Sequence, residues 1–113
     1  MTQQRLQHYL RTYRRRSGFS QREIAHLLGA SSGEKVSRYE SFARNPSVVT
    51  VFAYEIIFNQ PAREIFAGVY DAVRDNVRTR AKRMEKMLAA SLADDSRAAR
   101  KLQLLRDLAA MRN

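Results

Sequence analysis

Capping residues and glycines divide the middle of this sequence into short helical segments. Ser20 and Glu23 stand three residues apart, the spacing of a capping box in which each side chain binds the other residue's backbone amide. Ser31 and Glu34 have the same spacing, so we expect a second capping box at the start of the next segment. Gly29 lies between the two segments and favours a left-handed helix end. Because no stretch sustains the alternating pattern of a half-buried strand, the chain is predicted to be all-α.

The most apolar stretch of the chain covers residues 48–58 and contains only a threonine and a glutamate as polar side chains. It is too short to span a bilayer, so we expect it to be the central buried helix of the fold. Pro46 suits a first helical position, and either Asn45 or Ser47 suits the cap that precedes it.

The composition offers little material for chemistry. The chain has no cysteine, four glycines and two histidines, His8 and His26. The absence of cysteine excludes disulfides, thiol nucleophiles and thiolate metal sites. The small numbers of histidines and glycines leave few residues that could form a zinc centre or a glycine-rich phosphate loop. We therefore expect no enzyme, no catalytic or metal-binding residue, no cofactor and no small-molecule substrate. The absence of cysteine also fits a reducing compartment, so we expect a cytoplasmic protein.

The net charge of +10 is unevenly distributed. Residues 1–16 carry five arginines and no acidic residue, residues 17–60 are balanced, and residues 61–113 carry twelve basic and seven acidic residues. Such basic surfaces are typical of proteins that bind polyanions, nucleic acid first of all. The alternative is a basic face that is only solvated.

Several short blocks follow one another between Leu10 and Phe66: Leu10, Tyr13-Arg14, Gly18-Phe19-Ser20-Gln21, Glu23-Ile24-Ala25, Leu28-Gly29, Val36-Ser37-Arg38-Tyr39-Glu40, Arg44-Asn45-Pro46-Ser47 and Ile65-Phe66. In order and spacing these blocks resemble the helix-turn-helix domain of the Cro and phage-repressor (Xre-like) family. The resemblance implies a five-helix repressor-like domain over residues 1–70.

Two departures from the family pattern concern the second helix of the motif. The chain has one residue more than the common pattern between Gly29 and Val36, which leaves the register of base-contacting side chains open. Phe42 stands where the family often has glycine, so we expect this helix to end without a left-handed glycine cap.

The resemblance also implies site residues. The second helix of the motif enters the major groove and reads bases with its N-terminal part, while Val36 and Tyr39 face the core. The implied base-reading residues are Ser32, Gly33, Glu34, Lys35, Ser37 and Arg38, and the implied phosphate contacts are Arg14, Gln21, Arg44 and Asn45. Three of these have alternatives from the residues alone: Glu34 as a capping partner, Arg14 as a solvated surface arginine, and Asn45 as a helix cap.

Residues 71–113 are predicted to form a helical extension used for dimerisation or partner binding. One long helix runs from Pro61 to about Ala93, followed by a shorter terminal helix. Their apolar stripes need a cover, which is either a second subunit or a fold-back of the last helix; both can hold together. A basic ridge on the long helix either extends the nucleic-acid footprint or solubilises the helix. The dimer or partner residues are Val73, Val77, Met84, Leu88, Leu102 and Leu105, and the ridge is Arg74, Arg78, Lys82 and Lys86.

Taken together, these features predict a sequence-specific regulator of transcription that binds double-stranded DNA. We expect a homodimeric repressor that reads the major groove with the helix around residues 32–41, and we expect no membrane association. The alternative is an antitoxin-like or other interaction module, in which the same fold and the C-terminal helices bind a protein partner.

Overall fold

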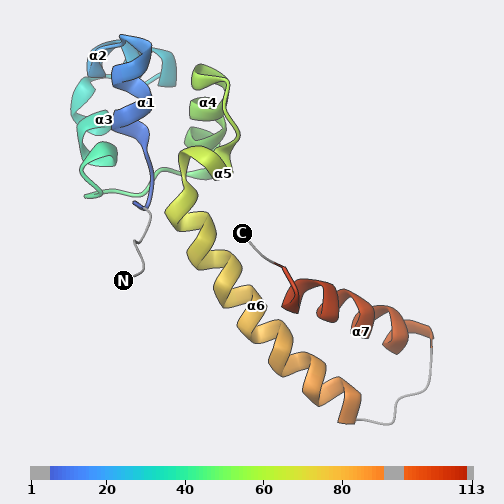
Figure 1. Cartoon of the computed structure of the whole chain (residues 1–113). Coiled ribbons are helices and arrows are strands. Elements are labelled where there is room, and N and C mark those ends of the chain that lie inside the picture. The colour runs from blue at the N-terminus through green and yellow to red at the C-terminus, as the bar shows by residue number, and fades with distance from the viewer. Residues whose placement is uncertain (1–5, 91–95, 112–113) are drawn as a thin grey trace. The chain divides into compact units, whose positions relative to one another are not determined.

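A computed structural model of the chain describes residues 6–90 and 96–111, and these residues form seven α-helices and no strand (Figure 1). The all-α prediction is therefore confirmed. The chain divides into two compact units, Met1–Tyr70 and Asp71–Asn113. The helices are α1 (Leu10–Ser17), α2 (Gln21–Leu28), α3 (Gly33–Glu40), α4 (Val48–Phe58) and α5 (Ala62–Ile65) in the first unit, α6 (Ala67–Ala90), which begins in the first unit and continues into the second, and α7 (Ser96–Ala109) in the second.

The first capping box forms as the sequence predicts. The Ser20 hydroxyl accepts from the Glu23 amide at 3.0 Å, and the Glu23 carboxylate accepts from the Ser20 amide at 2.9 Å. The hydrogen bond from the Ser20 amide to this carboxylate, followed by a contribution from the Ser20 hydroxyl, lowers the pKa of Glu23 because it stabilises the charged form. Gly18 and Gly29 end α1 and α2 in the left-handed conformation, with φ of 81° and 76°.

The second capping box does not form. Helix α3 begins at Gly33, and the residue at its cap is Ser32, whose side chain accepts no hydrogen bond from the helix. Glu34 therefore lies in the first turn of the helix, one position earlier than a capping partner of Ser32 would need to be. Its carboxylate pairs with Arg38 instead, at 2.9 Å.

The end of α3 is left-handed, but the residue that adopts this conformation is Phe42, with φ of 65°. The Ala43 amide donates to the Arg38 carbonyl at 2.9 Å, and the Phe42 amide donates to the Tyr39 carbonyl at 3.1 Å. This is the hydrogen-bond pattern of a Schellman motif, which usually places glycine at the left-handed position. The ring of Phe42 lies 4.6 Å from the buried ring of His8, and this contact helps to hold the strained backbone.

The core of the first unit draws on all five of its helices. Each contributes one side chain that is almost completely buried, and Tyr54 is the largest of them. The Tyr54 ring stacks on Phe58 at 5.7 Å and meets Tyr39 and Phe66 edge-on. Such aromatic contacts add to the free energy of burying the rings. The five side chains are Leu10, Ile24, Val36, Tyr54 and Ile65.

Helix α4 is not the central buried helix that its composition predicts. Tyr54 is its only fully buried residue, and one side of the helix is exposed, including Phe52 and Ile56. Composition counts apolar residues without showing which of them the neighbouring helices cover. The cap of α4 is Ser47, whose hydroxyl accepts from the Thr50 amide at 3.3 Å, and the helix starts two residues after Pro46.

The long helix predicted from Pro61 is interrupted. Helix α5 ends at Ile65, Phe66 leaves helical geometry with φ of −109° and ψ of 43°, and α6 begins at Ala67. The interruption places the Phe66 ring in the core, 6.4 Å from the ring of Tyr54. The last residues of the predicted helix, 91–93, lie outside the described part of the chain.

The segment before α1 runs alongside the α5–α6 junction. The Tyr9 amide donates to the Ile65 carbonyl at 2.7 Å, and the Val69 amide donates to the Gln7 carbonyl at 3.1 Å. Gly68 permits this approach, because a Cβ atom there would overlap with the backbone of the segment and would lie 2.8 Å from the Cα of Gln7. The close contact therefore requires a glycine at this position.

In the second unit, α7 packs back on α6. Ala81 of α6 and Leu105 of α7 are buried, and the Arg106 side chain donates to the Glu85 carboxylate at 3.3 Å. The fold-back expected as one cover for the apolar stripes is therefore present in this unit.

The predicted basic ridge on α6 is partly neutralised. The guanidinium of Arg74 pairs with Asp71 and Asp75, both at 3.1 Å. Arg78 approaches Asp75 at 3.5 Å and donates to the carbonyl of Met111 at 2.8 Å. The first two cations of the ridge are therefore paired within the chain, and Arg78 links α6 to the segment after α7, whereas the other two, Lys82 and Lys86, are exposed.

Candidate functional site

Helices α2 and α3 meet at their N-terminal ends. A Cβ atom on Gly33 would lie 3.3 Å from the backbone nitrogen of Arg22 and 3.4 Å from the carbonyl carbon of Gln21. The first turn of α3 is therefore in contact with the first turn of α2. Because first-turn amides have no acceptor inside their own helix, the positive ends of two helix dipoles lie next to each other here.

The two sides of α3 have opposite characters. Val36 and Tyr39 are buried in the core, as predicted, and their burial fixes the rotation of the helix about its axis. Lys35 and Arg38 are exposed. Of the predicted base-reading residues, Glu34, Lys35 and Arg38 are exposed on α3 and Ser32 is exposed at its cap, whereas Gly33 and Ser37 are half-buried.

An ion pair between Arg38 and Glu34 lies on this outer side. The Arg38 guanidinium donates to the Glu34 carboxylate at 2.9 Å, four residues apart on the helix. Both side chains are more than half exposed, so solvent screens the pair and it contributes little to stability. Arg38 can therefore exchange this acceptor for another at low cost.

The carboxylate of Glu40, at the end of α3, is buried and binds side chains of α1 and α2. Its side chain is 1% exposed and accepts from Arg14 at 2.6 and 3.1 Å and from Gln21 at 3.2 Å. Arg11 approaches the same carboxylate at 3.6 Å. The hydrogen bonds to Glu40 raise the pKa of Arg14, and its remaining terminal nitrogen donates to the Phe19 carbonyl at 3.1 Å.

These contacts favour a role for Arg14 within the fold. Its side chain is 14% exposed and its guanidinium binds protein acceptors, so it is not a solvated surface arginine, and its phosphate contact stays a prediction that these acceptors make less favourable. Sequence reasoning missed its partner Glu40. A signal was present, because Glu40 lies four residues after Val36 and therefore on the buried side of α3.

The other predicted phosphate contacts lie at two places in the first unit. Gln21 is the first residue of α2, and its side-chain amide binds Glu40, which holds it beside the helix end. Arg44 and Asn45 are exposed between α3 and α4. Asn45 is not the cap of α4, because Ser47 has that role.

The structure divides the predicted dimer residues into two groups. Val73, Val77 and Met84 are exposed on α6, between 41% and 56% of their full accessibility. Leu105 is buried, and Leu88 and Leu102 are half-buried. Leu105 is therefore unavailable to a second subunit, because the fold-back of α7 already covers it.

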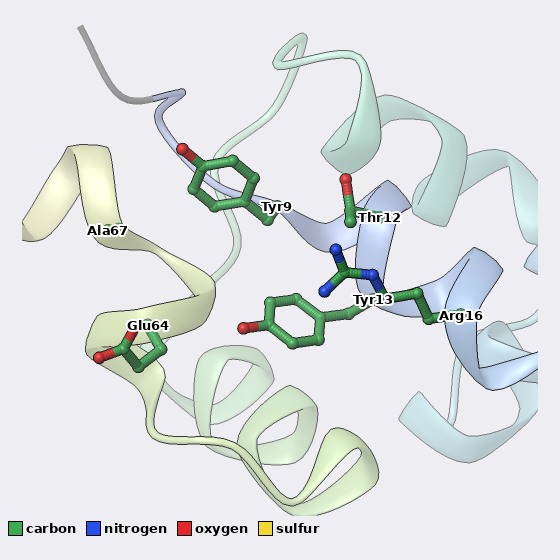
Figure 2. Close-up of a pocket in the computed structure, with 6 residues that line it drawn as sticks. All are labelled: Tyr9, Thr12, Tyr13, Arg16, Glu64 and Ala67. Atoms are coloured by element: carbon green, nitrogen blue, oxygen red, sulfur yellow. The ribbon is translucent and has the colours of Figure 1, made fainter. Parts of the chain in front are cut away.

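A shallow pocket lies beside α1, and Figure 2 shows the side chains that line it. Its volume is about 260 Å³. Its charged side chains, Arg16 and Glu64, are both exposed, and it is smaller than the roughly 300–1,000 Å³ typical of ligand sites. It therefore supplies no enclosed site for a small molecule. The lining residues are Tyr9, Thr12, Tyr13, Arg16, Glu64 and Ala67.

Comparisons with known proteins gave no match among family models, curated proteins or solved structures. Within residues 6–90 and 96–111, no three His, Asp or Glu side chains are grouped as a metal site would require. None of the described helices has the length and apolar character needed to cross a membrane.

Proposed function

We propose that this protein is a sequence-specific regulator of transcription that binds double-stranded DNA with a helix-turn-helix formed by α2 and α3. The observation that carries the proposal is the arrangement of α3, whose buried Val36 and Tyr39 orient Lys35 and Arg38 toward solvent beside the N-terminus of α2. In this reading the protein has the five-helix repressor-like fold over residues 1–70.

Each part of this surface suits one component of a DNA duplex. Lys35 and Arg38 are donors that match O6 and N7 of guanine in the major groove. The adjacent amino ends of α2 and α3 favour a phosphate, and Arg44 and Gln21 supply further contacts to the backbone. Glu34 is the acceptor that Arg38 gives up when it turns to a base.

Selection of bound sequences from random duplex DNA, at two salt concentrations, tests the proposal. We expect an enriched motif that persists at the higher salt. On that motif, Lys35→Ala and Arg38→Ala are each expected to weaken binding by about 5- to 150-fold, and to weaken binding to random DNA less. Arg63→Ala is the matched control, since Arg63 is an exposed arginine on α5. Equal losses on both DNAs would contradict base reading.

A second candidate function is the protein-interaction module. The observation that favours it is the exposure of Val73, Val77, Met84 and Met87 on α6, at 41–68%. The same selection separates the two candidates. A chain that enriches no motif, and whose DNA affinity collapses as salt rises, favours partner binding over base reading.

A further inference from the structure

One exposed side of α6 has the residue spacing of a coiled-coil seam. From Val73 onward, the side chains on this side follow one another at steps of four, three, four and three residues. This alternation is the a/d pattern by which one helix packs along another. Four of the five side chains are apolar and 41–68% exposed, and the central one is an exposed arginine. We call these residues the α6 seam: Val73, Val77, Arg80, Met84 and Met87.

The contacts of α6 with α7 and the residue that follows it lie on another side of the helix. Glu85 accepts from Arg106 at 3.3 Å, and Arg78 donates to the carbonyl of Met111 at 2.8 Å. At about 100° per residue, Glu85 and Arg78 lie about 120° or more around the helix from the middle of the α6 seam. The fold-back of α7 therefore leaves the seam open to a partner.

The α6 seam has cations and no carboxylate. Arg80 lies within it and Arg83 lies next to it, and neither has a carboxylate partner among the residues that the structure describes. The three carboxylates of α6 lie on other sides of the helix and are paired within the chain; they are Asp71, Asp75 and Glu85. A partner that covers the seam has to place an acceptor near Arg80, because burying an arginine without one is costly.

A second copy of this chain does not supply that acceptor. In a parallel pair of α6 helices, Arg80 lies opposite Arg80. In the two antiparallel registers that overlap four layers of the seam, Arg80 lies opposite Val77 or Met84, and the two arginines occupy neighbouring layers. Like charges so close together weaken either pair. The spacing thus favours a helix as the partner, and the charge favours an acidic helix from a different chain.

We propose that the α6 seam binds an amphipathic helix of another protein, which carries carboxylates opposite Arg80 and Arg83. Apolar residues of that helix pack between the four apolar side chains of the seam, two of which are flexible methionines that adapt to their partner. A phosphate backbone would neutralise the arginines but would leave these apolar side chains without packing partners. The inference rests on the second candidate function, to which it gives a class of partner, and not on DNA binding by α3.

Two synthetic peptides of three heptads test the proposal on the full chain. Both have leucine at the a and d positions except for one central seam position. This position and those beside the seam are glutamate in the first peptide and lysine in the second. Fluorescence anisotropy of the labelled peptides measures binding, and we expect the glutamate peptide to bind at least about tenfold more tightly than the lysine peptide.

Charge reversal separates the seam from the general attraction of a basic chain for an acidic peptide. Arg80→Glu/Arg83→Glu is expected to reverse the preference, so that the lysine peptide binds more tightly. Lys82→Glu/Lys86→Glu is the matched control, because it makes the same change in charge at two exposed lysines on another side of α6. We expect this control to keep the preference for glutamate. Far-ultraviolet circular dichroism checks that the variants are folded.

The apolar part of the seam has its own pair of variants. Val77→Asn is expected to weaken binding of the glutamate peptide at least about tenfold, whereas Thr79→Asn, at an exposed position outside the seam, leaves it unchanged.

Four outcomes would overturn the proposal. The wild-type chain would bind neither peptide at up to about 100 μM, or it would bind both equally. The preference for glutamate would survive Arg80→Glu/Arg83→Glu. Binding of phosphatidylglycerol vesicles that Val77→Asn abolishes, without binding of the glutamate peptide, would assign the seam to a lipid surface instead. None of these outcomes bears on base reading by α3.

Discussion

The guanidinium of Arg14 is predicted to stabilise the first unit rather than to contact DNA. In Arg14→Leu, the buried carboxylate of Glu40 loses its two shortest hydrogen bonds, at 2.6 and 3.1 Å. Removing one partner of a buried ion pair typically costs about 3–5 kcal/mol. Gln21 at 3.2 Å and Arg11 at 3.6 Å remain beside the carboxylate and offset part of this cost. We therefore expect the free energy of unfolding to fall by about 3 kcal/mol.

Urea unfolding, monitored by the tyrosine signal, measures this loss of stability in the first unit. All five tyrosines lie in the first unit and the chain has no tryptophan, so the tyrosine signal reports mainly on the first unit. Arg15→Leu is the control, because Arg15 is exposed on the same helix, and it is expected to change stability by less than about 0.5 kcal/mol. The double variant Arg14→Leu/Glu40→Leu should lose less than the sum of the single variants, since no buried charge is left alone.

One result would refute this reasoning about Arg14. If Arg14→Leu unfolded at the wild-type urea concentration while its DNA affinity fell on all sequences alike, the side chain would be acting at a phosphate. The ion pair with Glu40 would then contribute nothing to folding.

Two further predictions concern the N-terminal segment. Gly68→Ala should lower the free energy of unfolding of the first unit by about 2 kcal/mol, because its methyl group would displace the backbone near Gln7; an unchanged melting temperature would contradict this close approach. Burial lowers the pKa of His8 below its ordinary value of 6.5, so the unfolded chain binds more protons near that pH and stability should fall as the pH drops through about 6.5. The urea midpoints at about pH 7.5 and about pH 5.5 measure this loss of stability. We expect His8→Phe to remove most of the difference between the two midpoints, and His26→Gln, a variant at an exposed position, to retain the difference. A wild-type midpoint that does not change with pH would exclude the effect.

Features set by neighbouring residues were predictable from the sequence. The Ser20–Glu23 capping box and the left-handed ends at Gly18 and Gly29 form as expected, because each depends on residues within one turn of helix. The buried positions Val36 and Tyr39 on α3 follow from helical periodicity in the same way.

Features set by contacts between distant segments were not predictable. Glu40 determines the role of Arg14 from 26 residues away, and no local pattern contains both. The start of α3 is displaced from the predicted box to Gly33, which lies beside the first turn of α2, and the sequence does not show this contact. The exposed side of α4 could not be identified either, since a helix that is apolar all round does not show which side its neighbours leave uncovered.

The left-handed turn at Phe42 has a consequence for the motions of α3. A bulky residue in this conformation raises the energy of the folded backbone by about 1–2 kcal/mol, which local opening of the turn releases. The amides of Ala43 and Arg44 share the carbonyl of Arg38, so both are freed when this end opens. At the other end, Gly33 is packed against α2. We therefore expect the turn after α3 to open while the helix itself, held by buried Tyr39 and Glu40, keeps its position, so that hydrogen exchange is faster at the amides of Ala43 and Arg44 than within α3.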